Sequence, residues 1–355
     1  MSSDPDLLRV DIVVDNFNYG RYLSAAIESA LAQTHPTTHV IVVDDGSTDD
    51  SREILLRYED RVEVLLKENG GQASALNAGA ELCRGDVVIF LDADDLLHPE
   101  AAARAAAVLA ANPAAAKAQM RMQVIDAEGR PTGELKPPPR LSMPRGDLRR
   151  AELAYPFDLA WLPTSANAFR LESLRQILPL PESGFRIGAD WPLIHLSTLV
   201  GEVATVELVS CSYRVHGANN YEPLIPELDL DHVRETIGYA DATAAELLAL
   251  ADRLSLPRPT KILSISNLGQ RMISLRLDPD QHPVSTDTAR SLLRDSIGAV
   301  RRRDNASPLL RLAFVLWFAA MAIAPRPLAQ RLATWFRFPE RRGGLGRLLG
   351  AMQPR

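Results

Sequence analysis

Cysteine is scarce in this 355-residue sequence, which contains only Cys83 and Cys211. Two cysteines so far apart provide neither a disulfide framework nor the closely spaced pairs of a zinc site. A chain of this kind is typical of a reducing compartment, so we expect a cytoplasmic location. The first residues, MSSDPDLLRVD, agree with this expectation because they lack the basic segment and apolar core of a secretory signal.

Two common nucleotide-binding motifs are also missing. The first expected strand, residues 10–14, is followed by DNFNYG and not by the GxGxxG turn of dinucleotide-binding domains. A P-loop is absent as well. Nucleic acid is not an expected partner, because the arginines near the end of the chain alternate with Leu, Trp and Phe and no nucleic-acid-binding motif accompanies them.

The chain has the composition of a globular protein, with 46% apolar and 24% charged residues. Its length allows one large domain of roughly 220 to 250 residues and an appendage. We therefore expect a catalytic domain over residues 1–225 and a helical extension over residues 226–355.

Charge is distributed unevenly along the chain. Residues 301–355 contain eleven arginines, no lysine and two acidic residues, a net charge of +9, which leaves −15 for the first 300 residues. Within this tail, residues 309–324 are strongly apolar but shorter than the roughly 20 residues of a spanning helix. Two interpretations remain open. The tail is an amphipathic anchor on an anionic membrane, at the inner face of the plasma membrane, or it is a buried helix with a solvated basic end.

Short apolar runs alternate with helical patterns in the first third of the chain. The expected strands are residues 10–14, 39–43, 62–66 and 87–91, and the expected helices include residues 23–31, 73–81 and 99–109. This alternation predicts a doubly wound α/β fold with a parallel sheet. The proline-containing residues 126–150 indicate a long surface loop.

Three carboxylates, Asp92, Asp94 and Asp95, end the most apolar of these strands in the run VVIFLDADD. Clustered carboxylates repel one another unless a cation joins them, and oxygen ligands suit Mg²⁺ or Mn²⁺. The alternative is an acidic turn that caps the helix starting near Pro99.

Polar segments end three other strands of the same sheet, at residues 15–18, 44–45 and 69–72. The carboxyl ends of parallel strands share one edge, where ligands bind. Together the four segments offer an aromatic ring, several carboxylates and backbone donors near a helix start. This combination predicts a site for a nucleoside diphosphate.

The same motifs resemble the amino-terminal half of the family 2 glycosyltransferases with the GT-A fold. VVDDGSTD followed some forty residues later by LDADD is specific to that resemblance, which resumes at residues 166–170, 188–191 and 213–216. The resemblance implies a mostly parallel, Rossmann-like sheet flanked by helices. The helical C-terminal extension lies beyond it.

The resemblance also implies roles for matching residues on the donor side. Phe17 would lie against the nucleobase, and Asp45 would accept from its ring nitrogen, with Asp44 nearby. Asp92 would face the ribose or the sugar. The metal would be bound by Asp94 and His216. The remaining candidates for nucleotide binding are Asp15, Asn18, Gly71 and Gln72.

On the acceptor side, Asp190 matches the general base that receives the proton of the acceptor hydroxyl. Trp191 and Asn167 are the candidates for acceptor binding. The sequence departs from the family pattern at Leu76, where arginine is frequent, and at Ala189, where glutamate usually precedes the base.

The expected activity is therefore that of an inverting glycosyltransferase that depends on Mn²⁺ or Mg²⁺. It would move a sugar from a nucleotide sugar, with UDP as the default nucleotide, to a glycan or a lipid-linked acceptor in the synthesis of cell-surface polysaccharide or glycolipid. The alternatives are an inactive nucleotide-sugar or glycan-binding module and a sugar nucleotidyltransferase.

Overall fold

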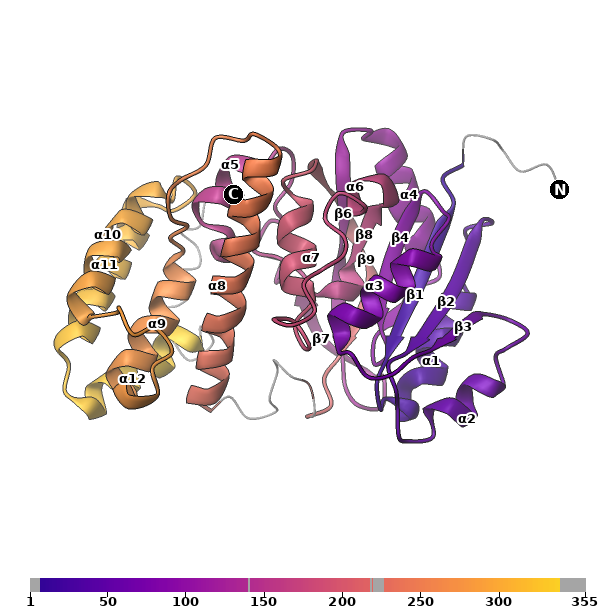
Figure 1. The fold of residues 1–355 in the computed structure, drawn as a ribbon, viewed down its shortest axis with the longest axis horizontal. Helices are drawn as coiled ribbons and strands as arrows, with labels where there is room; N and C mark the ends of the chain where they lie inside the picture. The colour runs from indigo at the N-terminus through magenta and orange to yellow at the C-terminus, as the bar shows by residue number, and fades with distance from the viewer. Residues whose placement is uncertain (1–6, 140, 218, 220–226, 339–355) are drawn as a thin grey trace. The chain divides into compact units, whose positions relative to one another are not determined.

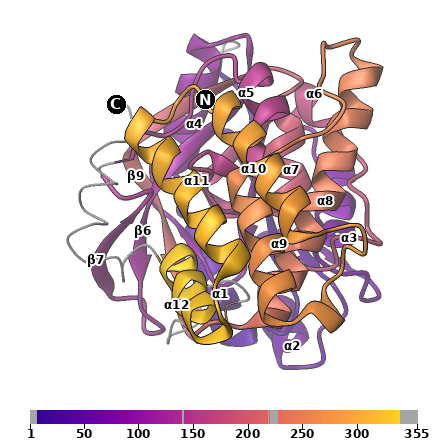
Figure 2. The same cartoon turned by 90° about the vertical axis from the view of Figure 1, so that its left-hand side faces the viewer.

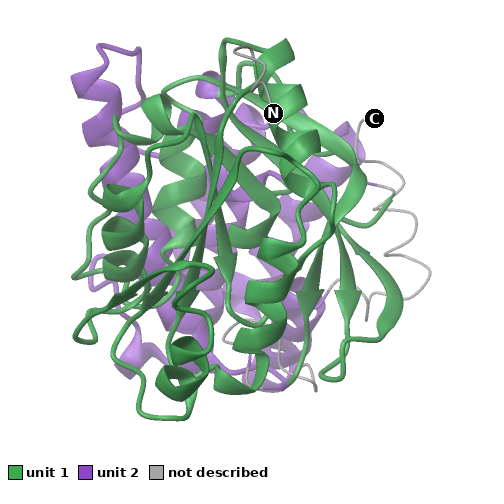
Figure 3. Ribbon diagram, turned by 90° about the vertical axis from the view of Figure 1, so that its right-hand side faces the viewer, with its two compact units in different colours: residues 1–139, 143–148, 160–216 green, residues 140–142, 149–159, 217–355 purple. Residues whose placement is uncertain are grey.

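The computed structural model describes residues 7–139, 141–217, 219 and 227–338, which form two compact units. Unit 1 contains residues 1–139, 143–148 and 160–216, and unit 2 contains residues 140–142, 149–159 and 217–355 (Figure 3). The predicted domain boundary at residue 225 lies outside the described residues.

Unit 1 is a mixed α/β domain (Figure 1). Its strands are β1 (Val10–Asn16), β2 (Thr38–Asp44), β3 (Glu63–Leu66), β4 (Val87–Asp92), β5 (Leu96–Leu97), β6 (Ala115–Ile125), β7 (Pro131–Lys136), β8 (Asn167–Arg170) and β9 (Glu202–Arg214). Its helices are α1 (Gly20–Leu31), α2 (Ser51–Leu56), α3 (Gln72–Leu82), α4 (Ala101–Ala111), α6 (Leu171–Leu174) and α7 (Asp190–Ser197).

The described strands form one sheet in the order β3-β2-β1-β4-β8-β6-β9-β5, with β7 paired to β6. Strands β1 to β4 are parallel, as predicted, and β1 and β4 are buried on both faces. Beyond β4 the sheet is mixed, since β8 runs antiparallel to both β4 and β6. The fold class expected from the sequence is confirmed.

The expectation of a long loop over residues 126–150 is wrong in part. Strand β7 lies inside that range and pairs with β6 as an antiparallel hairpin. Its side chains are exposed or only partly buried, so its sequence lacks the apolar pattern that reveals a strand.

Unit 2 is helical in its described part. It contains α5 (Arg149–Ala154), α8 (Leu230–Arg253), α9 (Ile265–Leu277), α10 (Ala289–Arg302), α11 (Pro308–Ile323) and α12 (Arg326–Arg337). Figure 2 shows α9 to α12 together, and their apolar side chains form one core that includes Trp317 and Phe318. Among the described residues no helix has the length and apolarity needed to cross a membrane.

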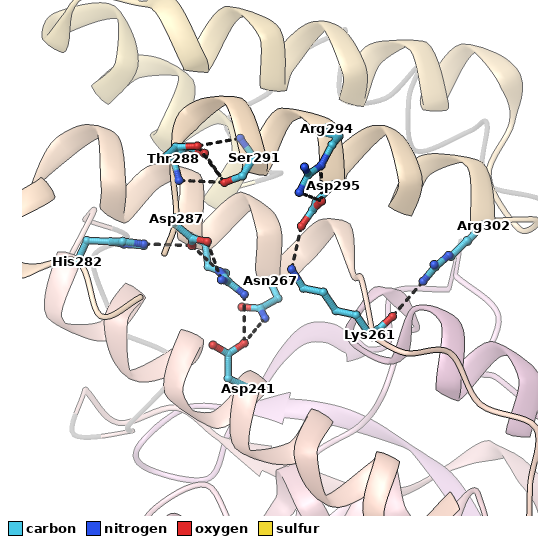
Figure 4. A network of polar contacts seen from close by, with 11 residues as sticks. Asp241, Lys261, Asn267, His282, Asp287, Thr288, Ser291, Arg294, Asp295 and Arg302 are labelled. Atoms are coloured by element: carbon cyan, nitrogen blue, oxygen red, sulfur yellow. Dashed lines mark hydrogen bonds and ion pairs between the residues drawn. The ribbon is translucent and has the colours of Figure 1, made fainter. Parts of the chain in front are cut away.

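A polar network joins two of these helices (Figure 4). The Arg271 guanidinium on α9 donates two hydrogen bonds of 2.7 Å to the carboxylate of Asp287, just before α10. His282 lies 3.2 Å from the same carboxylate, and Thr288 caps α10 by accepting from the backbone N–H of Ser291. The start of α10 is therefore fixed against α9 by charge as well as by apolar packing.

Candidate active site

Strand register places the acidic ends of β1 and β4 next to each other. Asp15 is the register partner of Asp92, and Asp94 follows two residues later. Burial and the charge of Asp94 raise the pKa of Asp15 to about 7. The pKa of Asp92 is raised by burial and then by the charges of Asp15 and Asp95. The Oδ1 atom of Asp15 is buried without a hydrogen-bond partner in the structure. The sheet edge thus concentrates negative charge that a cation would stabilise.

The side chains of Asp94 and His216 are in direct contact. The Nε2 atom of His216 lies 3.0 Å from Oδ2 of Asp94, and the histidine ring packs against Tyr19 and Tyr22 at centroid distances of 5.6 and 4.9 Å. Asp95 makes a different contact, in which its Oδ1 accepts from the backbone N–H of Arg214 on β9 at 2.9 Å.

These contacts fit a divalent cation held by two side chains. Within the described residues no group of three or more His, Cys, Asp and Glu side chains is arranged as a complete metal site. Mg²⁺ in phosphate-handling sites takes one or two carboxylates and completes its shell with water and substrate oxygens. Asp94 and His216, beside the unpaired oxygen of Asp15, supply a donor set of that kind.

The residues predicted for the nucleobase lie in two loops that are bonded to each other. Asn18, at φ 59°, accepts from the backbone N–H of Thr48 at 2.7 Å, and its own N–H donates to the Ser47 hydroxyl at 2.9 Å. Phe17 is 44% exposed. A ring exposed to this extent does not belong to the core and is available for stacking.

Asp44 and Asp45 are both buried, and their described hydrogen bonds go to the protein. Asp44 accepts from the side chain of Asn16 at 2.9 Å and from the N–H of Ser47 at 3.1 Å. Asp45 accepts from Lys67 Nζ at 2.6 Å and from the N–H groups of Gly70 and Gly71 at 2.9 and 2.7 Å. These bonds shape the loops of the site. The contact predicted between Asp45 and the base stays a prediction.

Asp190 is the first residue of α7 and is partly buried. Burial raises the pKa of its carboxyl to about 6, and the nearby His195 opposes part of this shift. Aspartate is also a good helix cap, so the alternative role of Asp190 is to cap a helix that begins at Trp191. In the structure the N-cap position belongs to Ala189, and Asp190 is the first residue of the helix. A carboxyl with a pKa near neutrality is suited to accept a proton.

The two residues predicted to bind the acceptor differ in exposure. Trp191 is partly exposed, with its ring 6.0 Å from that of His195. Asn167 is fully buried and donates to the carbonyl oxygens of Leu162 and Pro163 at 3.2 and 2.8 Å. Its described contacts support the loop before β8, and a contact with the acceptor stays a prediction.

A buried cation and two rings support this side of the site, and the sequence did not reveal them. Lys117 on β6 is fully buried, donates to the Ile194 carbonyl at 3.2 Å and lies 4.4 Å from the centroid of the Trp161 ring. Trp161 in turn contacts His195 edge-to-face at 5.8 Å. Isolated residues from three separate segments carry no shared spacing that could have indicated the cluster.

Comparison with known proteins gives the class of this chain, because its relatives in sequence are glycosyltransferases. Residues 11–178 match the family model described as glycosyl transferase family 2. An uncharacterized glycosyltransferase of Nostoc sp. is 34% identical over 219 residues, which are 60% of this chain and 67% of that protein. This chain belongs to glycosyl transferase family 2 and is a glycosyltransferase, which sets aside the nucleotidyltransferase and the inactive binding module.

Other similarities are shorter or more distant. The putative teichuronic acid biosynthesis glycosyltransferase TuaG of Bacillus subtilis is 41% identical over 90 residues, 24% of this chain and 36% of that protein. The crystal structures of S. aureus TarS 1-349 with UDP and with UDP-GlcNAc have TM-scores of 0.50 and 0.51, at 16% and 15% identity. Each covers 95% of this chain and 92% of the TarS chain, and the likeness shows the fold.

Proposed function

We propose that this chain is an inverting, metal-dependent glycosyltransferase that transfers a sugar from a nucleoside diphosphate sugar to a hydroxyl of a glycan or lipid-linked acceptor. Synthesis of cell-surface polysaccharide or glycolipid is the process that we propose for it. The observation that carries the proposal is the pair of carboxylate sites in unit 1. Asp94 with His216 forms one, and Asp190, with a pKa of about 6, forms the other.

The two sites would share the chemistry. Asp190 receives the proton of the acceptor hydroxyl while the acceptor oxygen bonds to the anomeric carbon, and the bond from that carbon to the diphosphate oxygen breaks. Attack opposite the leaving group inverts the anomeric carbon and needs no covalent nucleophile. A divalent cation, held by Asp94 and His216 when bound, would stabilise the negative charge of the leaving diphosphate.

On the donor side, we propose that Phe17 stacks on the nucleobase beside Asn18 and that Asp92 accepts from a hydroxyl of the ribose or sugar. UDP is the first nucleotide to test, because the TarS crystal structures with this fold are complexes with UDP and UDP-GlcNAc.

A release assay tests the activity. The full chain is incubated with UDP-, dTDP- and GDP-sugars, with and without Mn²⁺, and free nucleoside diphosphate is measured. We expect metal-dependent release from one donor and a loss of about 10²- to 10⁴-fold for Asp190→Asn, because the amide keeps the shape but not the basicity. Asp60→Asn, at an exposed position between α2 and β3, is the matched control. Activity of Asp190→Asn near that of the control would refute the assigned base, and retention of anomeric configuration in the product would refute inversion.

We also propose that unit 2 binds the surface of an anionic membrane through α11. One face of this helix is exposed and apolar, with Leu309, Leu312, Leu316 and Ile323 at helical spacing and 47%, 52%, 59% and 85% exposed. From residue 305 to residue 338 the chain has four arginines and no acidic residue. Arg326 and Arg331 of the following helix, α12, are exposed, and an apolar face combined with exposed arginines is complementary to an anionic leaflet.

A further inference from the structure

Gln72, the first residue of α3, joins the end of β4 to the residue before Asp190 through a single side chain. Its Nε2 donates to Oδ1 of Asp92 at 3.1 Å, and its Oε1 accepts from the backbone N–H of Ala189 at 3.1 Å. Asp92 ends the central strand, and Ala189 immediately precedes Asp190. A carboxamide suits this place because it donates at one atom and accepts at the other.

The backbone around Gln72 is bonded to the same segment. The N–H of Gln72 donates to the Arg186 carbonyl at 2.7 Å, and the N–H of Ala73 donates to the Phe185 carbonyl at 3.3 Å. The first N–H groups of a helix need partners outside the helix, and here carbonyls of residues 185–186 supply them. Two backbone donors at the start of α3 thus hold this segment in place.

Close packing fixes the same junction. Gly71 has φ +90°, and a Cβ atom built there would lie 2.6 Å from Cα of Arg186. The Arg186 guanidinium returns to the turn and donates to the Gly70 carbonyl at 3.3 Å and to the Asn69 side chain. The segment that leads into α7 is thus held against the turn before α3 by backbone hydrogen bonds, by the side-chain hydrogen bonds of Arg186 and by close packing at Gly71.

We propose that Gln72 is a positioning residue that sets Asp190 relative to the end of β4, and that it does not act by binding the nucleotide. The inference rests on the proposed role of Asp190 as base. Ala189 is fully buried, so its backbone N–H, and not its side chain, is the group by which this position contributes to the site. Misplacing a catalytic group by about 1 Å can cost roughly 10²-fold in rate, so one such bond can matter.

Gln72→Met tests the inference, because methionine has a similar length and neither bond. We expect kcat to fall by about 10- to 100-fold, while the affinity for UDP, measured by calorimetry with Mn²⁺, changes by less than about threefold. The matched control is Gln33→Met. Gln33 also bridges two segments, donating to the Ser29 and His98 carbonyls and accepting from the N–H of Ala102. It lies on the α1–α4 side, and its variant should lose thermal stability without losing kcat.

The opposite pattern would overturn the inference. If Gln72→Met weakens UDP binding by tenfold or more and leaves kcat at saturating donor unchanged, Gln72 is a nucleotide ligand. If methionine prevents folding, Gln72→Glu provides the same test, since it keeps an acceptor for Ala189 and places a second carboxylate against Asp92. That variant should also lose kcat.

A double variant separates the inference from the assignment of the base. In the Asp190→Asn background, Gln72→Met should lower kcat by less than about twofold, because a residue that acts through Asp190 has nothing left to position. Fully multiplicative losses would show that Gln72 acts independently and would refute the inference. Nearly wild-type transfer by Asp190→Asn alone would instead refute the proposed base, and the split between kcat and UDP affinity in the single variant would still decide whether Gln72 binds nucleotide.

Discussion

The aspartates at the sheet edge differ in how they are stabilised. Asp44 and Asp45 are buried and accept hydrogen bonds from neighbouring groups of the protein, which gives the loops their shape. Asp95 accepts from the backbone N–H of Arg214, although burial and the charge of Asp94 raise its pKa. Burial also raises the pKa values of Asp15, Asp92 and Asp190, and Asp94 lies against His216. At these last four residues we expect substitutions to change chemistry more than folding.

Asp94→Ala should abolish transfer and the metal-dependent part of nucleotide binding, while Asp94→Glu should retain a trace. The carboxylate lies beside His216 at the crowded end of the sheet, and a hard cation needs closely placed oxygen ligands. Calorimetry with UDP, with and without Mn²⁺, measures the effect. Mn²⁺-dependent turnover by the alanine variant at the wild-type rate would show that Asp94 is not a ligand.

The rate of transfer should fall in acid because Asp190 must be ionised to accept a proton. Its pKa is raised to about 6, so kcat should be flat above about pH 7 and should fall toward tenfold per pH unit well below pH 6. A pH profile at saturating donor and acceptor checks this expectation. If the acid limb is the same in the residual activity of Asp190→Asn, another group is responsible for it.

Phe17→Ala should weaken nucleotide affinity by about 1 to 3 kcal/mol, the contribution of a ring stacked on a base. Because the ring is 44% exposed, thermal stability should change little. Leu56→Ala, at another exposed apolar residue of unit 1, is the control for unspecific effects of truncation. A large loss of stability with unchanged affinity would make Phe17 a structural residue.

At the scale of elements, apolar content decided which strands the sequence predicted. Strands β1, β2 and β4 are nearly continuous runs of Val, Ile, Leu and Phe, and each was predicted to within a few residues. Strand β6 was missed, although it is almost entirely buried, because its sequence AAKAQMRMQVI mixes Ala and Met with Lys117 and Arg121. Its fully buried lysine is accommodated by partners from other segments, which no local pattern reports.

The residues of the candidate site could also be predicted only in part from local sequence patterns. The strand-end residues could be predicted because parallel strands bring their carboxyl ends to one edge, whatever the loops do. The link from Gln72 to Ala189 joins residues 117 positions apart, and the sequence places neither near the other. This hydrogen bond forms because the fold places the segment before α7 beside the start of α3. Tertiary contacts of this kind are what the sequence pattern cannot supply.

In unit 2, the pair of Arg271 and Asp287 links α9 to the start of α10. Both side chains are mostly buried and joined by two hydrogen bonds. Asp287→Ala would remove both bonds and leave Asp241, at 3.7 Å, as the described carboxylate nearest to Arg271, at a cost of about 1.5 to 3 kcal/mol. Differential scanning calorimetry should show a lower unfolding temperature. Asp252→Ala removes a carboxylate from an exposed pair with Arg258 and should leave the unfolding temperature nearly unchanged, because exposed ion pairs contribute little to stability. Equal effects of the two would mean that Asp287 is not part of the packing of α10.

At the scale of the whole molecule, α11 has two apolar faces, of which one is buried within unit 2 and the other is exposed. One packs in unit 2, where Trp317 is buried, donates to the Leu332 carbonyl at 3.0 Å and stacks on Phe336 at 4.3 Å. Of the two interpretations of the tail that the sequence leaves open, this packed face agrees with a buried helix. The other face, defined by Leu309, Leu312, Leu316 and Ile323, is exposed among the described residues, and it is the face that we propose binds an anionic membrane.

Vesicle binding tests that partner. The double substitution Leu312→Glu and Leu316→Glu should reduce co-sedimentation with vesicles of phosphatidylcholine and phosphatidylglycerol by at least about tenfold, because each leucine transferred from water contributes about 1.5 to 3 kcal/mol. The wild-type chain should also bind less to vesicles of phosphatidylcholine alone, and less at high salt, because the arginines of this helical segment attract anionic lipid.

The matched control is Leu56→Glu with Leu208→Glu, at two leucines of unit 1 that are 65% and 62% exposed. Unchanged vesicle binding by the α11 variant would refute a lipid surface. If that variant instead turned a dimer into a monomer in analytical ultracentrifugation, the exposed face would belong to a contact between two copies of this chain.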